Sequence, residues 1–415
     1  MKNFLFKWLR KSEKYTKTDM VYLIGQSGWL ITGQGILMVS SLGLAWVFGN
    51  FVEPSDYGIY RYVLTIATIA SITTLTGFGI AIARSVTQGH TIDLKRILKI
   101  KIKFGLIGSA ALLAIATYYL YKDNTLMATL MAITSIWIPF FDSLSDYQYV
   151  LQGKKHFKLQ TIIRVLQRLT LTILVVITIF LTKNIVAITF VYFAATTLSQ
   201  YIAYRYTQAK YFNSDDTDTP YQSITKYAKN VSIQNIFFIG AGHLDKVLLF
   251  KLLGPTQLAV YFFAIAIPNE IQGVLGNINS VAFPKLVNKN TRDFKIALLK
   301  KIGLSTILLL IPTALYWLAA PYIFTWLFPV YLESIFISQL FVGTILFIPA
   351  SLFWHYFYAV ENKRALWYGT ILGPSTLIIG IIALVPSFGL IGAVMAVYLR
   401  SIVDLIFGLY FFIRK

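Results

Sequence analysis

The chain alternates between long apolar runs and short polar segments. A membrane span needs about 20 mostly apolar residues, and no charged residue occurs from Met20 to Val52. The uncharged stretch from Ala365 to Leu399 is too long for one span, and the turn residues from Pro386 to Gly389 divide it into two. The pattern predicts twelve helices, over about 27–49, 58–83, 103–121, 125–150, 160–182, 185–206, 229–252, 257–281, 302–320, 334–359, 366–385 and 390–412.

The positions of Lys and Arg predict which helix ends face the cytoplasm, because cytoplasmic loops are enriched in these residues. With both termini inside, most of the 37 Lys and Arg residues fall in cytoplasmic segments. Only Lys122, Lys183 and Lys251 fall on the outer side. A different number of spans would destroy this alternation. We therefore predict an all-α polytopic membrane protein with cytoplasmic N and C termini.

Composition supports this class and excludes others. Hydrophobic residues make up 57% of the chain and charged residues 13%, whereas soluble domains carry about 25% charged residues. A net charge of +20 would suggest nucleic acid in a soluble protein. Here the charges lie between apolar runs, so membrane lipid and not nucleic acid is the expected partner. The absence of Cys excludes disulfides and thiol nucleophiles, and four scattered His residues suggest no metal site.

The polar segments suggest a division into two lobes. Residues 1–19 can form a basic interfacial helix on anionic lipid, or they can be a frayed tail. Residues 213–224 contain the polar run Asn213-Ser-Asp-Asp-Thr-Asp-Thr-Pro220, and we expect them to form a cytoplasmic linker. We expect an N-lobe of six helices over 20–212 and a C-lobe of six helices over 225–415.

Weak internal similarity relates the two predicted lobes. The aligned pairs are Pro54 with Pro255, Tyr60 with Tyr261, Tyr147 with Tyr356, and Lys154 with Lys363. They fall at equivalent places, after the first helix of each lobe and at the end of the fourth. Two such repeats would have the same orientation in the membrane, as in transporters that alternate access around a central site.

Several motifs resemble one family across nearly the whole chain. The stretch Phe51-Val-Glu-Pro-Ser-Asp-Tyr-Gly-Ile-Tyr60 resembles the G-P-x-x-Y-G-x-Y signature of polysaccharide exporters, and Leu253-Gly-Pro-Thr-Gln-Leu-Ala-Val-Tyr261 is its partner. Similar segments are His243-Leu-Asp-Lys-Val-Leu-Leu, Val281-Ala-Phe-Pro-Lys285 and Gln152-Gly-Lys154. The family is the O-antigen and capsule repeat-unit (Wzx-type) flippases of the multidrug/oligosaccharidyl-lipid/polysaccharide (MOP) exporter superfamily. Glu53 and Ala259 depart from the signature, where Gly is common.

The resemblance implies a MATE-like, V-shaped pair of lobes around a central cavity. The implied function is alternating-access transport of undecaprenyl-diphosphate-linked oligosaccharide from the cytoplasmic to the outer leaflet, for surface polysaccharide synthesis. It implies a monomeric protein of the bacterial cytoplasmic (inner) membrane, with a polysaccharide polymerase and a chain-length regulator as partners. No cofactor is expected, although transport could be coupled to H⁺ or Na⁺.

Charged residues near the spans are candidates for substrate binding, because such charges are costly unless paired or facing water. Arg61 could bind a diphosphate through paired hydrogen bonds, or it could pair with Glu53 or Asp56 at the outer interface. Lys246 is a candidate phosphate or sugar ligand and Asp245 a sugar acceptor. These neighbours point about 100° apart on a helix, so we expect separate partners for them.

Two further cations occupy repeat-related positions. Arg84 and Lys285 lie at the cytoplasmic ends of their predicted helices. They could catch a diphosphate as it enters. They also satisfy the positive-inside rule without any further role.

Other ionisable residues are candidates for ion or proton coupling. Glu270 follows Pro268 near mid-membrane, where it could couple transport to a cation or pair with Lys246. Asp142 and Asp146 are four residues apart, so they would share a helical face, and one could hold a proton. Arg164 or Arg168 could instead neutralise them. His243 could titrate near neutral pH, and His355 is the repeat equivalent of Asp146.

Arg400 and Asp404 are also four residues apart, and we expect an internal salt bridge between them.

Three rival functions are weaker. Multidrug antiporters of the superfamily often hold a coupling carboxylate in the first helix, and this chain has none there. Flippases of peptidoglycan precursors usually have fourteen spans. A polysaccharide polymerase or membrane glycosyltransferase would need sizeable outer loops, whereas the predicted outer loops are short. We therefore do not expect an enzyme.

Overall fold

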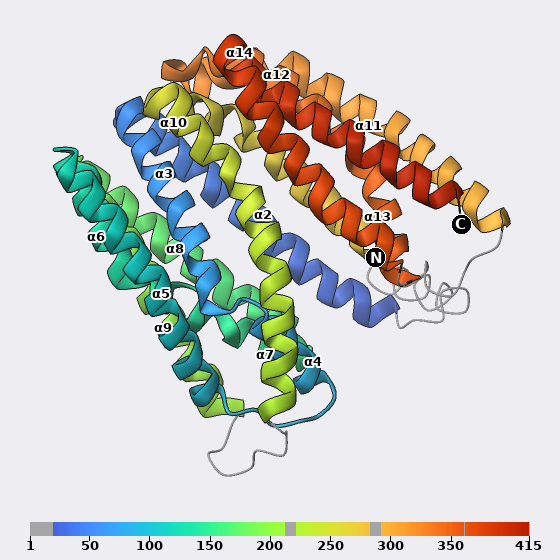
Figure 1. Ribbon diagram of the computed structural model, residues 1–415, viewed down its shortest axis with the longest axis horizontal. Coiled ribbons are helices and arrows are strands. Elements are labelled where there is room, and N and C mark those ends of the chain that lie inside the picture. Colours follow the sequence, from blue (N-terminus) through green and yellow to red (C-terminus); the bar gives the residue numbers. More distant parts are fainter. Residues whose placement is uncertain (1–19, 212–220, 283–291, 361, 415) are drawn as a thin grey trace, which may run out of the picture. The chain divides into compact units, whose positions relative to one another are not determined.

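The computed structural model describes residues 20–211, 221–282, 292–360 and 362–414, and these are almost entirely helical (Figure 1). Residues 1–19, most of the predicted linker and Lys285 lie outside the described residues.

The first six predicted spans correspond to the elements up to α9. In chain order they are α2 (Met20–Phe51), α3 (Pro54–Ser71), the 3₁₀ turn η1 (Ile72–Thr74), α4 (Phe78–Thr87), α5 (Leu94–Tyr121), α6 (Thr125–Phe141), η2 (Ser143–Asp146), α7 (Tyr147–Gly153), α8 (Phe157–Thr182) and α9 (Ile185–Tyr211).

The last six correspond to the remaining elements. They are α10 (Tyr221–Ala282), α11 (Arg292–Leu327), η4 (Pro329–Tyr331), α12 (Ser334–Val342), η5 (Gly343–Ala350), α13 (Ser351–Ala359) and α14 (Lys363–Ile413).

Two of these elements each contain two helices. α10 is interrupted at Gly254 (φ 85°) and α14 at Gly389 (φ 56°), where glycine tolerates a positive φ without the clash that a Cβ would cause. Within the described residues, 9 helices are long and apolar enough to cross a membrane, or 10 if the bent pair around Leu75 is one span. Separating α10 and α14 at their glycines gives the twelve helices expected, including the predicted break at Gly389.

Three predicted spans are not continuous helices. The span over 58–83 bends by 55° between η1 and α4, where Leu75 takes a left-handed conformation with φ 61°. The span over 125–150 changes to 3₁₀ geometry after Phe141, and the span over 334–359 does so after Val342. Pro139 lies two residues before the end of α6, and Pro349 lies near the end of the 3₁₀ segment η5. Proline removes a backbone donor and clashes with the preceding turn.

The first compact unit comprises Met1–Leu44 and Ala70–Ile233. Within it, α5 packs along α6, α8 along α9, and the short α4 against α7 (Figure 1). A core near the ends of these helices is built on Phe78, Ile82, Tyr147, Val150 and Leu151, all fully buried. This packing holds the break between α6 and α7 against α5.

The second compact unit comprises Ala45–Ile69 and Gln234–Lys415. The end of α2 and the start of α3 thus belong with the C-terminal helices, and the predicted lobes over 20–212 and 225–415 stay a prediction. Aromatic rings join these segments: the ring centroid of Phe263 lies 4.9 Å from that of Tyr57 and 3.9 Å from that of Tyr331. Phe48 stacks on Tyr60 at 4.8 Å.

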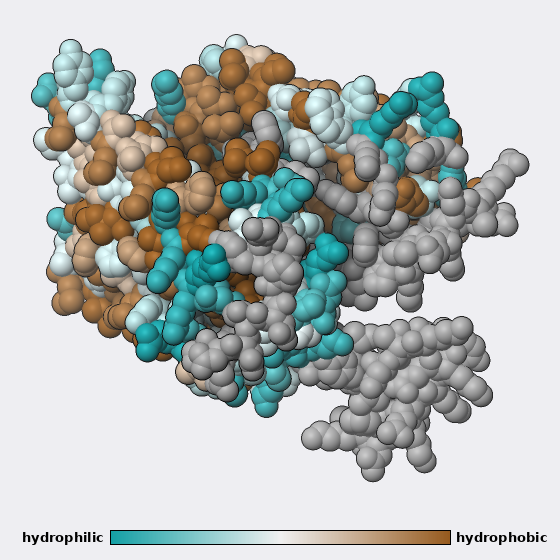
Figure 2. Space-filling model, turned by 60° about the horizontal axis from the view of Figure 1, so that its bottom comes forward, coloured by the Kyte–Doolittle hydropathy of each residue, from teal (hydrophilic) through white to brown (hydrophobic). Residues whose placement is uncertain are grey.

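Exposed faces of the long helices are apolar, as expected for contact with lipid. On α11 the exposed residues Leu304, Ile307, Ile311, Leu315 and Leu318 form one stripe at helical spacing. Figure 2 shows apolar side chains over much of the visible surface, with hydrophilic ones in its lower middle and along its upper edges. The chain is therefore a multi-pass membrane protein, and which helix ends face the cytoplasm stays a prediction.

A glycine contact in the second unit gives the first testable prediction. A Cβ at Gly58 would overlap the carbonyl group of Pro255, whereas a Cβ at Gly43 in α2 would meet nothing within 4 Å. We expect Gly58→Ala to destabilise the protein by about 1–3 kcal/mol through overpacking. Gly43→Ala should be neutral or stabilising, because alanine favours a helix over glycine.

Thermal unfolding of the purified full chain, followed by tryptophan fluorescence, measures both variants. Equal melting temperatures for Gly58→Ala and wild type would contradict the close contact of α3 with α10.

Candidate functional site

The first unit contains a buried ionic cluster inside its helices. Lys101 of α5 is only 1% exposed, and its Nζ lies 3.1 Å from Oδ2 of Asp142 and 2.8 Å from Oδ1 of Asp146. Thr74 also donates a hydrogen bond to Oδ2 of Asp142, at 3.0 Å. With one cation and two carboxylates, the cluster has a net charge of −1 when all three groups are ionised.

The break in the α6–α7 span places the two carboxylates. Asp142 follows the last residue of α6, and Asp146 ends the 3₁₀ turn η2. The sequence predicted that they share the face of one continuous α-helix, which they do not. The 3₁₀ turn η2 nevertheless directs both carboxylates toward the ammonium group of Lys101. Oδ2 of Asp146 is buried and has no hydrogen-bond partner within the described residues. A proton on that oxygen would relieve an unsatisfied buried group.

The cation of this cluster is not the one expected from the sequence. Neither Arg164 nor Arg168 forms an ion pair with it in the described part of the chain, and Arg168 donates instead to the Ser41 hydroxyl at 2.9 Å. The span predicted over 103–121 excluded Lys101, which the sequence analysis did not single out. Its spacing from other residues could have indicated that it is buried, because Lys101 lies on the same helical stripe of α5 as the buried residues Ile97, Gly105 and Gly108.

The second unit contains a separate cluster on α3 and α10. Nζ of Lys246 lies 2.9 Å from each carboxylate oxygen of Asp245 and 3.2 Å from the carbonyl oxygen of Gly242. The expectation of separate partners for these neighbours was wrong, because the long Lys246 side chain folds back along the helix. No ion pair joins Lys246 to Glu270 within the described residues.

Arg61 is the second cation of this cluster, and it forms no ion pair within the described residues. Its guanidinium carbon lies 3.9 Å from the ring centroid of Phe262 and 6.0 Å from that of Tyr57. In the described residues it forms no ion pair with Glu53 or Asp56, and its buried Nε has no hydrogen-bond partner. Stacking on an aromatic face holds a guanidinium in place while its N–H groups stay available to an anion.

His243 lies among these charges. Lys246, Asp245 and Arg61 are all close enough for their charges to act on the imidazole. Its Nδ1 is buried without a hydrogen-bond partner in the described part of the chain. Two cations, one carboxylate and one imidazole give a net charge of +1 with neutral His243. A planar guanidinium beside an ammonium suits a phosphate or diphosphate.

The remaining candidates occupy varied positions. Arg84 is exposed on α4, with its guanidinium 5.2 Å from the ring centroid of Tyr227. Glu270 is half-buried on α10 and forms no ion pair within the described residues. Nδ1 of His355 lies 2.8 Å from the carbonyl oxygen of Ser351, one turn earlier in α13. The described residues contain no group of three or more His, Asp or Glu that could hold a metal ion.

The internal salt bridge expected in α14 is confirmed. Nε of Arg400 lies 3.7 Å from Oδ2 of Asp404.

The buried ion cluster gives a stability prediction. Replacing Lys101 by Met leaves two carboxylates without their cation, which typically costs about 3–5 kcal/mol for a buried pair. We expect Lys101→Met to lower the melting temperature strongly, and Asp146→Asn added to it to recover part of the loss. Lys99→Met, at an exposed position on the same helix, is the matched control. A Lys101→Met protein as stable as this control would refute the cluster's structural role.

A family model and solved structures identify the class of protein. The model of the polysaccharide biosynthesis protein family matches residues 24–289. No curated protein matches the chain in a sequence comparison.

Solved structures of transporters share its fold. The lipid II flippase MurJ, in an inward closed conformation, matches with a TM-score of 0.71 and 12% identity, over 93% of this chain and 87% of that one. An inward-facing multidrug resistance MATE family transporter of the MOP superfamily matches with a TM-score of 0.57 and 17% identity, over 91% and 94%. A MOP superfamily transporter from Pyrococcus furiosus matches with a TM-score of 0.60 and 15% identity, over 94% and 95%.

The family model covers more than half of the chain, and its description agrees with the resemblance in the motifs. The chain therefore belongs to the polysaccharide biosynthesis protein family and has the fold of the MOP superfamily transporters.

Proposed function

We propose that the protein is a flippase for undecaprenyl-diphosphate-linked oligosaccharide repeat units. It would move them from the cytoplasmic to the outer leaflet of the bacterial cytoplasmic membrane, for O-antigen or capsule synthesis. The observation that carries the proposal is the Arg61 guanidinium, which forms no ion pair within the described residues and, like Asp245 and Lys246, lies close enough to His243 for its charge to act on the imidazole. This cluster has the net positive charge and the N–H donors that binding a diphosphate would use.

The chemistry of the step explains why such a cluster is needed. A diphosphate cannot enter a low-dielectric region unless cations replace its water. Arg61 offers paired N–H donors in a fixed plane because Phe262 supports its face. Lys246 adds a second positive charge, and the Asp245 carboxylate partly neutralises it. The cluster would therefore bind the anion weakly enough to release it. Asp245 could also accept a hydrogen bond from a sugar hydroxyl.

Arg84 and Lys285 would act earlier in transport. In the predicted topology both lie at cytoplasmic helix ends, where they would attract the diphosphate before it reaches Arg61. The protein would work as a monomer by alternating access, with a polymerase and a chain-length regulator using its product.

An ion-coupled multidrug antiporter is the second candidate, because MATE transporters share the fold. One sequence feature opposes it: no carboxylate occurs in the first span, from Met20 to Phe51. A drug cation would also be repelled by the net positive charge around Arg61. A polysaccharide polymerase or glycosyltransferase is less favoured still, since the family and fold are those of transporters.

Coupling to an ion gradient would use the other candidate groups. The Lys101 cluster has one carboxylate oxygen of Asp146 without a partner in the described residues, so a proton could bind there. Glu270 is the alternative, as a half-buried carboxylate without an ion pair in the described part of the chain. H⁺ and Na⁺ remain the two candidate ions, with His243 and His355 as further candidate coupling groups.

Sidedness of the lipid-linked sugar tests the transport proposal. In a host lacking the gene, the polyprenyl-diphosphate sugar should accumulate in the inner leaflet, and the wild-type gene should restore its delivery. We expect Arg61→Gln to reduce delivery at least about tenfold, the effect of losing one charge-assisted hydrogen-bond pair. Arg205→Gln, at an exposed position on α9, is the control of equal charge change.

The outcomes separate the site from the function. If wild type restores delivery and Arg61→Gln does so equally well, the flippase stands and the site is wrong. If delivery is normal without the gene and the host becomes sensitive to drugs, the antiporter replaces the flippase.

Transport by the full chain in liposomes tests coupling. We expect an inward-directed or outward-directed pH gradient to change the rate, and Asp146→Asn to abolish that change because its unpaired oxygen can no longer exchange a proton. Asp123→Asn is the control, since Asp123 is exposed and asparagine tolerates its left-handed conformation. An Asp146→Asn protein with the wild-type pH response would exclude this site. The same assay with Glu270→Gln and a Na⁺ gradient then tests the alternative.

A further inference from the structure

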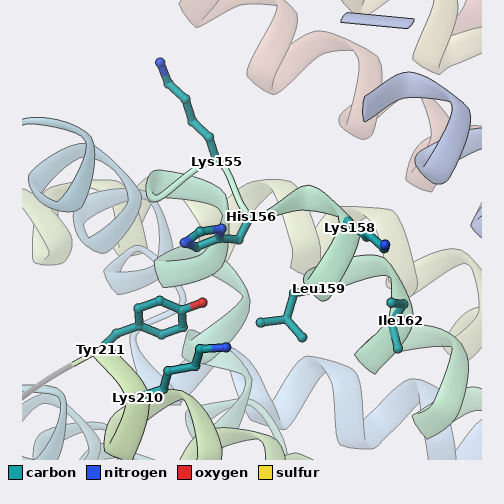
Figure 3. A pocket seen from close by; sticks show the side chains of 7 residues that line it. All are labelled: Lys155, His156, Lys158, Leu159, Ile162, Lys210 and Tyr211. Carbon is teal, nitrogen blue, oxygen red and sulfur yellow. The ribbon is translucent and has the colours of Figure 1, made fainter. Parts of the chain in front are cut away.

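A basic pocket in the first unit takes no part in the proposed transport site. It has a volume of about 470 Å³ and lies between the start of α8 and the end of α9 (Figure 3). Its cations are Lys155, Lys158 and Lys210, and its apolar part is Leu159 and Ile162. By the positive-inside rule, this end of the helices is the cytoplasmic one.

The chain turn at the rim of the pocket is well defined. α7 ends with two reverse hydrogen bonds, from the N–H of His156 to the carbonyl oxygen of Leu151 at 2.8 Å and from the N–H of Lys155 to that of Gln152 at 2.9 Å. This pattern requires a left-handed residue, usually glycine, but Lys155 takes that place with φ 60°. The chain thus holds a cation where glycine would be less strained. Figure 3 shows its side chain extending outward at the rim.

Aromatic rings support the other cations. The ammonium of Lys158 lies 4.7 Å from the ring centroid of Trp29, and that of Lys210 lies 5.7 Å from the ring centroid of Tyr211. The Tyr211 ring in turn packs against His156, with centroids 5.2 Å apart. No ion pair neutralises the three lysines within the described residues, so the pocket has a charge of about +3 to offer an anion.

An apolar stripe continues from the pocket along α8. Ile162, at the pocket, is followed at helical spacing by Leu166, Leu169, Ile173 and Ile177, all exposed. A soluble anion would gain nothing from this stripe. A lipid would place its acyl chain on it while its phosphate reached the lysines.

We propose that this pocket binds the phosphate headgroup of an anionic membrane phospholipid, with an acyl chain along the α8 stripe. Basic pockets between helices at the cytoplasmic surface are suited to such headgroups. The inference does not depend on the transported substrate. It assigns α8 and α9 an annular lipid site outside the Arg61 cluster.

Native mass spectrometry of the purified full chain tests the site, with phosphatidylglycerol as probe and phosphatidylcholine as the zwitterionic reference. The triple variant Lys155→Gln, Lys158→Gln, Lys210→Gln should bind phosphatidylglycerol at least about tenfold more weakly. Lys95→Gln, Lys99→Gln, Lys103→Gln removes the same charge from exposed positions on α5 and should bind as wild type does. Equal losses in both triple variants would overturn the pocket in favour of diffuse attraction.

Two further measurements test the role of Lys155 and that of the acyl chain. Lys155→Gly should keep or raise the melting temperature, because it relieves a left-handed conformation, while it weakens phosphatidylglycerol binding; unchanged binding would remove Lys155 from the site. Ile162→Ser should weaken phosphatidylglycerol binding, and glycerol 3-phosphate should bind far more weakly than the lipid. If glycerol 3-phosphate binds as tightly as the lipid, the pocket is a site for a soluble phosphate and the proposal fails.

The acidic residues that follow Tyr211 in the sequence are tested as a competitor for the pocket. Asp215, Asp216 and Asp218 follow the pocket in the chain. Changing all three to Asn should leave phosphatidylglycerol binding within about twofold of wild type. A large increase would mean that these carboxylates, and not a lipid, are the occupants of the pocket.

Discussion

The arrangement of this protein depends on the cost of placing a charge among apolar helices. An ionised side chain within a span needs a partner or water, and each paired case here meets that need in a different way. Lys101 of α5 forms ion pairs with two carboxylates at the break between α6 and α7. Lys246 folds back to pair with its neighbour Asp245, and Arg400 pairs with Asp404 one helical turn away. Arg61 differs from them, since within the described residues it stacks on aromatic faces and forms no ion pair. A cation that the fold orients without neutralising is the group best placed to meet an anionic substrate.

Much of the fold could be predicted from apolar runs because lipid imposes a simple rule on the length and composition of a span. The break in α14 was predictable from Pro386 and Gly389. The breaks near Asp142 and Val342 were not, since a proline inside a span can be accommodated as a kink or as a change to 3₁₀ geometry, and packing decides between them. Both breaks occur in spans that the internal similarity relates, the ones that contain Tyr147 and Tyr356. The two spans thus share a change to 3₁₀ geometry as well as a weak sequence similarity.

The candidate sites were harder to predict than the fold. The sequence identified Asp142 and Asp146 as a pair but not Lys101, because a lysine near a helix end satisfies the positive-inside rule as well as it fills a buried position. For Asp245 and Lys246, helical geometry alone predicted separate partners, which was wrong. The geometry fixes the direction of each Cα–Cβ bond but not the position of the ammonium group at the end of a long, flexible lysine side chain. The sequence offered Glu53 and Asp56 as ionic partners of Arg61. The packing of the helices instead places the ring of Phe262 against its guanidinium.

The buried position of Lys101 also bears on how the chain enters the membrane. α5 is synthesised before the residues that neutralise it, so Lys101 would meet the bilayer without a counter-charge if α5 inserted alone. Its place near the start of the helix lets the long side chain extend to the lipid headgroups in the meantime. Once Asp142 and Asp146 have emerged, the ammonium can exchange the headgroups for the two carboxylates. Insertion of α5 and α6 as a helical hairpin, followed by inward movement of one lysine, is thus the order of assembly that the ionic cluster favours.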